Sequence, residues 1–238
     1  MKQSLVGVSF LQEGEGKDLL FLHGYLSNKE SFSAQIAYFS KFYRVTAVDF
    51  LGFGQSAPIP TAFSVDDYAD WLDEVLQALA VRQPLVIAHS FGCRVAVKSA
   101  SKNPTAFDKI VLTGPAGVIM NRGVAYHLRV GAYRLVKKIA PRFAARRFGS
   151  REYRSLSPLM RESYKKIVNE DLRKCAGQVC NEVLILQGTK DTVTTEKEAQ
   201  AYLQAFPNAR LRYIDGGHFA FAEHPTEFCL QVEEFFYE

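Results

Sequence analysis

The chain of 238 residues is 47% hydrophobic and 23% charged, and its formal net charge at pH 7 is +4. These values are typical of an ordinary globular protein with a sizeable core, in one large domain or two small ones. They exclude a membrane-embedded chain, because no stretch approaches the roughly 18 apolar residues of a membrane span. The N-terminal segment also lacks the apolar run and cleavage site of a secretory signal, so we expect a soluble protein of the cytoplasm.

The cysteines and glycines give no sign of a bound cofactor. Four cysteines are scattered along the chain, too few for a disulfide framework at this length, and we expect free thiols. Cys175 and Cys180 lack the second pair or nearby histidine that a metal site would need. The glycine-rich segment 52–56 lacks the lysine of a phosphate-binding loop. The sequence therefore predicts no metal and no cofactor, and it contains no nucleic-acid recognition motif.

Short apolar runs recur along the chain and indicate a sheet. Residues 4–14 alternate between apolar and polar, which suits an antiparallel strand at a sheet edge. The later runs are continuous, as in the strands of a parallel sheet that helices cover on both faces. These runs lie at residues 19–24, 43–50, 84–90, 108–114, 182–188 and 210–217.

The segments between the runs have helical spacing. In residues 64–80, five apolar side chains fall on one helix face, and Ser64 precedes Asp67 by three residues, as in a helix cap. The five are Tyr68, Leu72, Val75, Leu76 and Leu79. This alternation of strand and helix predicts an α/β fold with a mostly parallel sheet.

One segment breaks the alternation. Residues 115–176 show only helical patterns, such as those at 124–140 and 159–174, and 62 residues is too long for an ordinary connection. We predict a helical cap inserted into a core domain made of residues 1–114 and 177–238.

The predicted cap also differs from the core in charge. Between Pro115 and Lys174 there are 15 Lys and Arg against 4 Asp and Glu, whereas the rest of the chain has 14 against 21. Either the cap is a lid whose apolar face lines a pocket and whose basic face attracts an anionic substrate, acyl carrier or membrane surface, or it is a solvated basic surface over ordinary core. Tyr25, Phe91, Tyr126 and Tyr133 could narrow such a pocket, or each could simply pack in the core.

Chemically active side chains directly follow several predicted strands. Ligands of open parallel sheets bind at the carboxyl ends of the strands, where this chain has Ser90, Asp191 and His218. A serine hydroxyl needs a base to take its proton, and a carboxylate must orient that base. Asp215 is a weaker rival to Asp191, because it lies only three residues before His218.

The segment around Ser90 nearly matches the G-x-S-x-G pattern of a sharp strand-to-helix turn that exposes a nucleophile. Gly92 supplies the second glycine, and Ala88 replaces the first with only one extra methyl group. For the other histidines we expect lesser roles. His23 orders its loop, His89 packs or takes part in a hydrogen bond, His224 starts a helix and His127 is solvated in the cap.

Together these motifs resemble the α/β-hydrolase superfamily, in its branch with a serine nucleophile and a small cap. The resemblance implies a twisted sheet of the eight-stranded type, with Ser90 as nucleophile, His218 as general base and then acid, and Asp191 as its orienting carboxylate. It also implies an oxyanion hole made by the backbone N–H groups of Tyr25 and Phe91. The segment "DFLGFGQS" matches the D-x-x-G-x-G-x-S turn of the superfamily, which shapes the site without taking part in bond making.

The resemblance implies a carboxylesterase that acts on short to medium acyl esters through an acyl-enzyme intermediate. Two alternatives within the same fold are a thioesterase and a hydrolase of C–C bonds in diketone-type substrates. An alternative of another class is a ligand-binding receptor with a slow triad. The expected partner is a small-molecule ester, anionic or linked to an acyl carrier if the basic cap takes part. The sequence does not indicate an oligomeric state.

Overall fold

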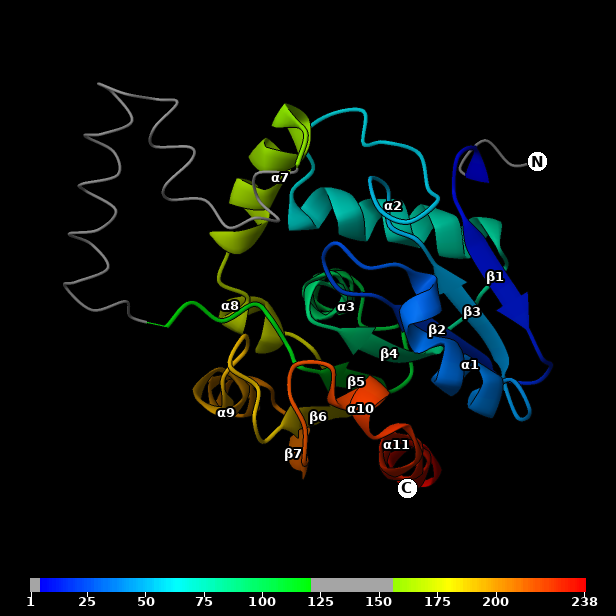
Figure 1. Cartoon of the computed structure of the whole chain (residues 1–238), viewed down its shortest axis with the longest axis vertical. Coiled ribbons are helices and arrows are strands. Elements are labelled where there is room, and N and C mark those ends of the chain that lie inside the picture. Colours follow the sequence, from blue (N-terminus) through cyan, green and yellow to red (C-terminus); the bar gives the residue numbers. More distant parts are fainter. Residues whose placement is uncertain (1–4, 121–155) are drawn as a thin grey trace.

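The structure, a computed structural model, describes residues 5–120 and 156–238. A seven-stranded sheet forms its centre, in the order β1-β3-β2-β4-β5-β6-β7 (Figure 1). The strands are β1 (Phe10–Glu13), β2 (Asp18–Leu22), β3 (Arg44–Val48), β4 (Leu85–His89), β5 (Ile110–Thr113), β6 (Val183–Gly188) and β7 (Ala209–Ile214). The helices are η2 (Lys29–Phe32), α1 (Ser33–Phe39), α2 (Val65–Ala78), α3 (Phe91–Lys102), α7 (Pro158–Val168), α8 (Arg173–Ala176), α9 (Glu196–Ala205), α10 (Ala220–Glu223) and α11 (Pro225–Tyr237).

The sheet confirms the predicted fold class. Strand β1 pairs antiparallel with β3 at one edge, as its alternating pattern predicts, and the other described strands pair in parallel. Seven strands lie in the described residues, against the eight-stranded type implied by the resemblance. Within the predicted edge strand at 4–14, β1 covers only Phe10–Glu13, and residues 5–9 form no strand. Strand β7 is only half-buried, whereas the sequence predicts a strand covered on both faces. It is the last strand of the sheet, so one of its sides has no neighbour.

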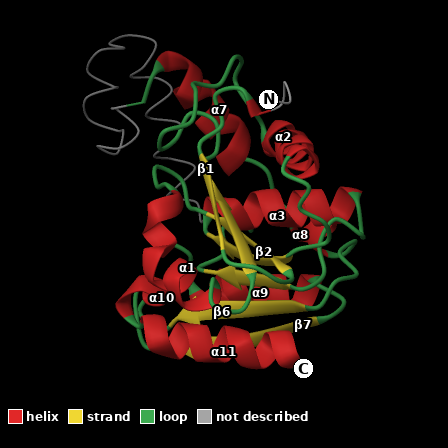
Figure 2. Ribbon diagram, turned by 90° about the vertical axis from the view of Figure 1, so that its right-hand side faces the viewer, coloured by secondary structure: helices red, strands yellow, loops and turns green. Residues whose placement is uncertain are grey.

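Helices cover both faces of the sheet (Figure 2). Successive side chains of a strand point to opposite faces, so Leu20 and Leu22 of β2 pack with α2 and α3, while Leu19 and Phe21 pack with α1 and α11. Strands β2, β4, β5 and β6 are buried throughout, which explains their continuous apolar sequences. Helix α2 begins with the predicted cap, since Ser64 and Asp67 form a reciprocal capping box.

Helices α7 and α8 lie in the segment predicted as a cap, and Figure 1 shows α7 next to α2. The continuous helical pattern at 159–174 is two helices in the structure. The side chains of Asn169 and Asp171 bond to the backbone at Lys165 and Arg173, and such local bonds compete with the helix. The helix predicted at 124–140, with Tyr126, His127 and Tyr133, lies outside the described residues. The domain boundaries at 114/115 and 176/177 stay predictions.

Within the described ranges, no helix is both long enough and apolar enough to cross a membrane. The same residues contain no group of three or more His, Cys, Asp or Glu side chains arranged to hold a metal ion. All four cysteines are free thiols, and Cys93 and Cys229 are buried. A cytoplasmic location stays a prediction from the sequence.

Candidate active site

Ser90 occupies a strained turn between β4 and α3. Its backbone has φ +48° and ψ −103°, a left-handed conformation that costs a non-glycine residue on the order of 1–3 kcal/mol. The turn requires the glycine that follows it, because a Cβ at position 92 would lie 2.3 Å from the carbonyl oxygen of Leu22. Ala88 is fully buried within β4, and its methyl group fits the core. The missing first glycine of the pattern therefore does not prevent the turn.

His218 and Asp191 form a direct contact at the carboxyl ends of β6 and β7. The Nδ1 atom of His218 lies 2.8 Å from Oδ2 of Asp191, and Thr194 Oγ1 donates to the same carboxylate oxygen over 2.8 Å. The other oxygen, Oδ1, accepts from the backbone N–H groups of Val193 and Thr194. Gly114, after β5, leaves room for this pair, since a Cβ there would lie 3.1 Å from His218 Nδ1.

The surroundings of Asp191 keep it ionised. Burial acts to raise its pKa, but the hydrogen bond and charge of His218 and the bonds from Thr194 outweigh burial, so the pKa lies below its ordinary value. The rival Asp215 is exposed and pairs with Lys190 and Thr189 instead. The structure thus brings Asp191, and not Asp215, to the ring of His218.

Ser90 and His218 line one cavity of about 430 Å3. Tyr25 and Phe91 line it as well, and Asp191 stands behind His218. No hydrogen bond joins Ser90 to the His218 ring among the described residues, and such bonds are often long in the absence of substrate. The three residues of the predicted triad and the two of the predicted oxyanion hole are therefore all close to one cavity at the carboxyl edge of the sheet.

The loop after β2 is held by His23, as the sequence predicts. The backbone N–H of Phe50 donates to Nε2 of this ring over 3.1 Å, so Nε2 carries no proton. Nδ1 must then be the protonated nitrogen, and it donates to the Gly24 carbonyl over 2.7 Å. Burial lowers the pKa of His23 to about 4, which keeps the ring neutral. Because a peptide is planar and trans, fixing the Gly24 carbonyl directs the Tyr25 N–H to the opposite side.

The "DFLGFGQS" turn is organised by a buried carboxylate. Asp49 is fully buried and accepts from the backbone N–H groups of Lys29 and Gln55 and from Lys29 Nζ over 3.0 Å. Burial acts to raise the pKa of Asp49, but these bonds outweigh burial and lower it. Gly54 has φ +53°, and a Cβ there would lie 2.3 Å from the carboxylate. Asp49 therefore holds the turn together and is not among the described residues that line the cavity.

His89 is a second support for His218. Its Nε2 donates to the His218 carbonyl over 3.0 Å, and the two ring centroids are 4.7 Å apart. Burial, followed by the charge of His218, lowers the pKa of His89 to about 3, so the ring is neutral. The buried Nδ1 has no partner in the described structure. For His89 the sequence predicted packing or a hydrogen bond, without indicating a partner.

An aromatic cluster forms one wall of the cavity. The ring of Tyr25 contacts Phe53, Phe91 and Tyr164, at centroid distances of 4.9, 5.6 and 5.2 Å. Phe91 is itself 2% exposed and packs against other rings of the core, so packing accounts for most of its surface. Tyr164 belongs to α7, which brings the predicted cap segment into contact with the site.

Sequence reasoning did not single out Arg94, which also lines this cavity. The available signal was its spacing, because residues four apart on a helix share a face and α3 begins directly after Ser90. Its partners come from α7 and the residues after it, more than seventy positions along the chain, which no local pattern reveals.

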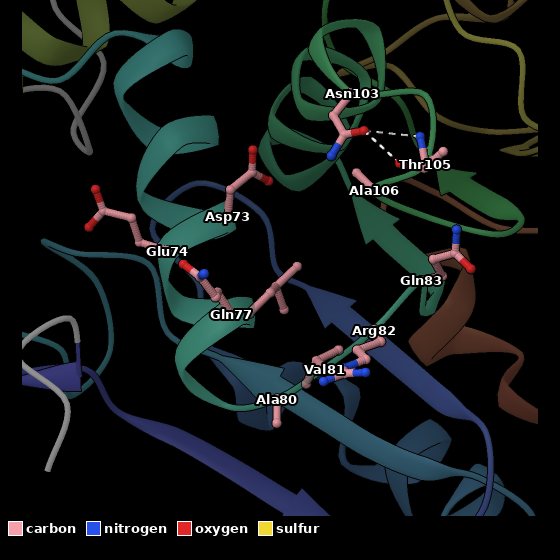
Figure 3. A pocket seen from close by; sticks show the side chains of 11 residues that line it. Asp73, Glu74, Gln77, Ala80, Val81, Arg82, Gln83, Asn103, Thr105 and Ala106 are labelled. Atoms are coloured by element: carbon pink, nitrogen blue, oxygen red, sulfur yellow. Dashed lines mark hydrogen bonds between the residues drawn. The ribbon is translucent and has the colours of Figure 1, made fainter.

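A larger cavity of about 840 Å3 lies elsewhere (Figure 3). It is bounded by the end of α2, the connection to β4 and the residues after α3, at the amino end of β4. In Figure 3, Asn103 bonds to Thr105, and Asp73 lies on the facing helix. The Ser90 turn and the His218 pair both lie at the carboxyl edge instead. The smaller cavity is therefore the candidate active site.

Comparison with known proteins identifies the family of this fold. The model of the alpha/beta hydrolase family matches residues 19–232. An uncharacterised protein of Mycobacterium tuberculosis is 25% identical over 263 aligned positions, which cover 95% of this chain and 77% of that protein. The (E)-2-((N-methylformamido)methylene)succinate hydrolase of Acinetobacter baylyi is 30% identical over 106 positions, or 44% of this chain and 40% of that protein.

Among solved structures, the meta-cleavage product hydrolase CumD of Pseudomonas fluorescens superposes with a TM-score of 0.75. The two sequences are 25% identical, and the match covers 96% of this chain and 93% of that one.

Proposed function

This chain belongs to the alpha/beta hydrolase family, and on that premise we propose that it is a serine carboxylesterase for short to medium acyl esters. The observation that carries the proposal is the juxtaposition of a strained, cavity-lining serine with a histidine whose Nδ1 is 2.8 Å from a buried carboxylate. Esterases use this arrangement because a serine hydroxyl is a poor nucleophile until a positioned base takes its proton.

In the proposed mechanism, His218 Nε2 takes the proton of Ser90 as Oγ attacks the ester carbonyl. Asp191 holds the Nδ1–H tautomer and stabilises the imidazolium that forms. The N–H groups of Tyr25 and Phe91 donate to the oxyanion. His23 orients the Gly24–Tyr25 peptide for this, because it donates to the Gly24 carbonyl. His218 then protonates the leaving alcohol, and water activated by the same ring releases the acid and restores Ser90. No cofactor enters this reaction.

The size of the cavity supports a small substrate. A volume of about 430 Å3 lies at the lower end of the range usual for ligand sites. Three exposed apolar side chains line the cavity, those of Leu26, Val193 and Phe219. A short or medium acyl chain can pack against these apolar side chains.

A fluorophosphonate probe tests the proposal directly, since it forms a bond only with an activated serine. We expect purified protein to be labelled, the Ser90→Ala variant to remain unlabelled, and p-nitrophenyl esters to be hydrolysed fastest between acetate and octanoate. An early burst of p-nitrophenol would reveal the acyl-enzyme. The proposal fails if Ser90→Ala turns over esters as fast as the parent, or if no acyl length is hydrolysed.

A second candidate is hydrolysis of C–C bonds in diketone-type substrates, which the likeness to CumD favours. Cleavage of 1-phenyl-1,3-butanedione faster than any p-nitrophenyl ester would support that candidate. A thioesterase would instead prefer acyl thioesters to the matched oxygen esters. A shift in melting temperature with ligand, without any turnover, would favour a binding receptor.

A further inference from the structure

Arg94 is buried beside the nucleophile. It lies four residues after Ser90 on the same face of α3, so their backbones are about 6 Å apart along the helix axis. Both side chains line the same cavity. Arg94 is only 7% exposed, and among the described lining residues it is the one that carries a permanent charge. A fixed positive charge therefore stands within one helical turn of the proposed reacting centre.

Among the described residues, hydrogen bonds engage one side of the Arg94 guanidinium and not the other. Nη1 donates to the carbonyl oxygens of Ile167 and Glu170, each over 2.9 Å, at the end of α7. A guanidinium has five N–H groups, and those of Nε and Nη2 bond to none of the described residues. Nε and Nη2 form one edge of the planar group, which is the geometry that binds both oxygens of a carboxylate.

The positive charge of Arg94 has no counterion in the described structure. The other two buried cations there are ion-paired, Lys29 with Asp49 and Lys98 with Glu170 and Asp66. The acids that attract Arg94 electrostatically are engaged elsewhere, because Glu170 bonds to Lys98 and Asp171 to Arg173. Burial accordingly lowers the pKa of Arg94. An unpaired buried charge is costly, so a cavity that contains one suits an anionic ligand.

From this we propose that Arg94 binds a carboxylate on the acyl part of the substrate, and that the preferred substrates are half-esters of short dicarboxylic acids. The inference rests on the proposed ester hydrolysis at Ser90. One helical turn separates the two residues, so the acyl chain between the scissile carbonyl and the free carboxylate is only a few carbons long, as in succinate or glutarate. A residue of the predicted core domain, Arg94 on α3, would then recognise the anion, independently of the basic residues of the predicted cap.

The test compares two esters of matched shape. The p-nitrophenyl half-ester of succinate carries a carboxylate where p-nitrophenyl 4-methylpentanoate carries an isopropyl group. We expect kcat/KM of the parent protein to be at least about 10-fold higher for the half-ester. In Arg94→Gln the ratio of the two kcat/KM values should fall on the order of 100-fold, because a hydrogen-bonded charge pair loses one partner. Arg94→Lys should give an intermediate ratio, since it keeps the charge and loses the planar edge.

Lys98→Met is the matched control. Lys98 lies one turn further along α3 and also holds the segment after α7 through Glu170, but it does not line the cavity. Its variant should keep the ratio of the parent protein. An equal loss of ratio in Lys98→Met and Arg94→Gln would mean that Arg94 merely anchors α7, and would overturn the proposal. So would a parent protein that hydrolyses the uncharged ester as efficiently as the half-ester.

Calorimetric binding of monomethyl succinate to Ser90→Ala separates this inference from the proposed esterase activity. Binding to Ser90→Ala but not to Ser90→Ala/Arg94→Gln, without turnover by the parent, would retain the anion site and reject the esterase. Turnover of uncharged esters without binding of monomethyl succinate would retain the esterase and reject the anion site. If Arg94→Gln does not fold, three measurements still test the proposal. They are the kcat/KM ratio of the parent protein, the same ratio for Arg94→Lys, and the binding of monomethyl succinate to Ser90→Ala.

Discussion

At the scale of the residue, the carboxylates of Asp191 and Asp215 offer a sharp contrast. Both follow strands at the same sheet edge, yet one is buried against His218 and the other is exposed and paired with Lys190. If Asp191 orients the base, Asp191→Asn should stabilise the wrong tautomer of His218. We then expect kcat for p-nitrophenyl butyrate to fall by about 10³- to 10⁴-fold.

The control for this prediction is Asp215→Asn, which removes a carboxylate three residues from the same histidine. Its kcat should stay within a factor of about three of the parent, because exposed ion pairs contribute little. A large loss in Asp215→Asn together with near-parental activity in Asp191→Asn would reverse the assignment. Circular dichroism spectra of both variants would show whether the fold is retained.

Individual residues also show where sequence reasoning reached its limit. Ser90, Asp191 and His218 could be placed because each directly follows a strand, and strand ends of a parallel sheet meet at one edge. Arg94 could not, because its significance depends on what surrounds it. The carbonyls that it contacts belong to α7, and the absence of a counterion is a property of the folded cavity.

At the scale of the element, the β4–α3 turn depends on a close approach between backbones. Gly92 is packed against β2, where a Cβ would lie 2.3 Å from the Leu22 carbonyl oxygen and 2.9 Å from that of His23. In Gly92→Ala, α3 must move away from β2 and take Ser90 with it. We expect the free energy of unfolding to drop by about 1–3 kcal/mol, measured by urea denaturation, and the proposed hydrolysis of p-nitrophenyl butyrate to become at least about 10-fold slower.

Gly177→Ala is the control at this scale. Gly177 follows α8 with φ −65°, and a Cβ there would be 3.6 Å from its nearest neighbours, an ordinary contact. Its stability should change by less than about 1 kcal/mol. Equal stability and activity of both variants would show that the turn tolerates a side chain at position 92.

The elements also differ in how well their sequences define them. Buried strands such as β4 and β6 were predictable within one or two residues, because continuous apolar runs need cover on both faces. The end of α7 was not, since it depends on the side-chain bonds of Asn169 and Asp171 with nearby backbone. The half-exposure of β7 follows from its place at the edge, which a strand's own sequence does not specify.

At the scale of the whole molecule, stability should depend on pH through two neutral buried histidines, His23 and His89. Their pKa values are lowered to about 4 and about 3, mainly because burial disfavours the charged ring. In the unfolded chain both rings take up protons near pH 6.5. Their contribution to stability is therefore complete above about pH 6.5 and is lost as the pH falls toward the folded pKa values.

As the pH falls through this window, protonation of each ring in the unfolded chain should lower the free energy of unfolding by up to about 1.4 kcal/mol per pH unit. Urea denaturation between pH 8 and pH 5 measures the slope, above the range in which Asp49 and Asp191 lose their own contributions. In His89→Gln this slope should be shallower by the contribution of one histidine. The variant is also expected to be less stable at pH 8, because it loses a hydrogen bond, but that loss does not change the slope. An unchanged slope in His89→Gln would show that this ring does not remain neutral in the folded protein, and that the loop of His218 is held in another way.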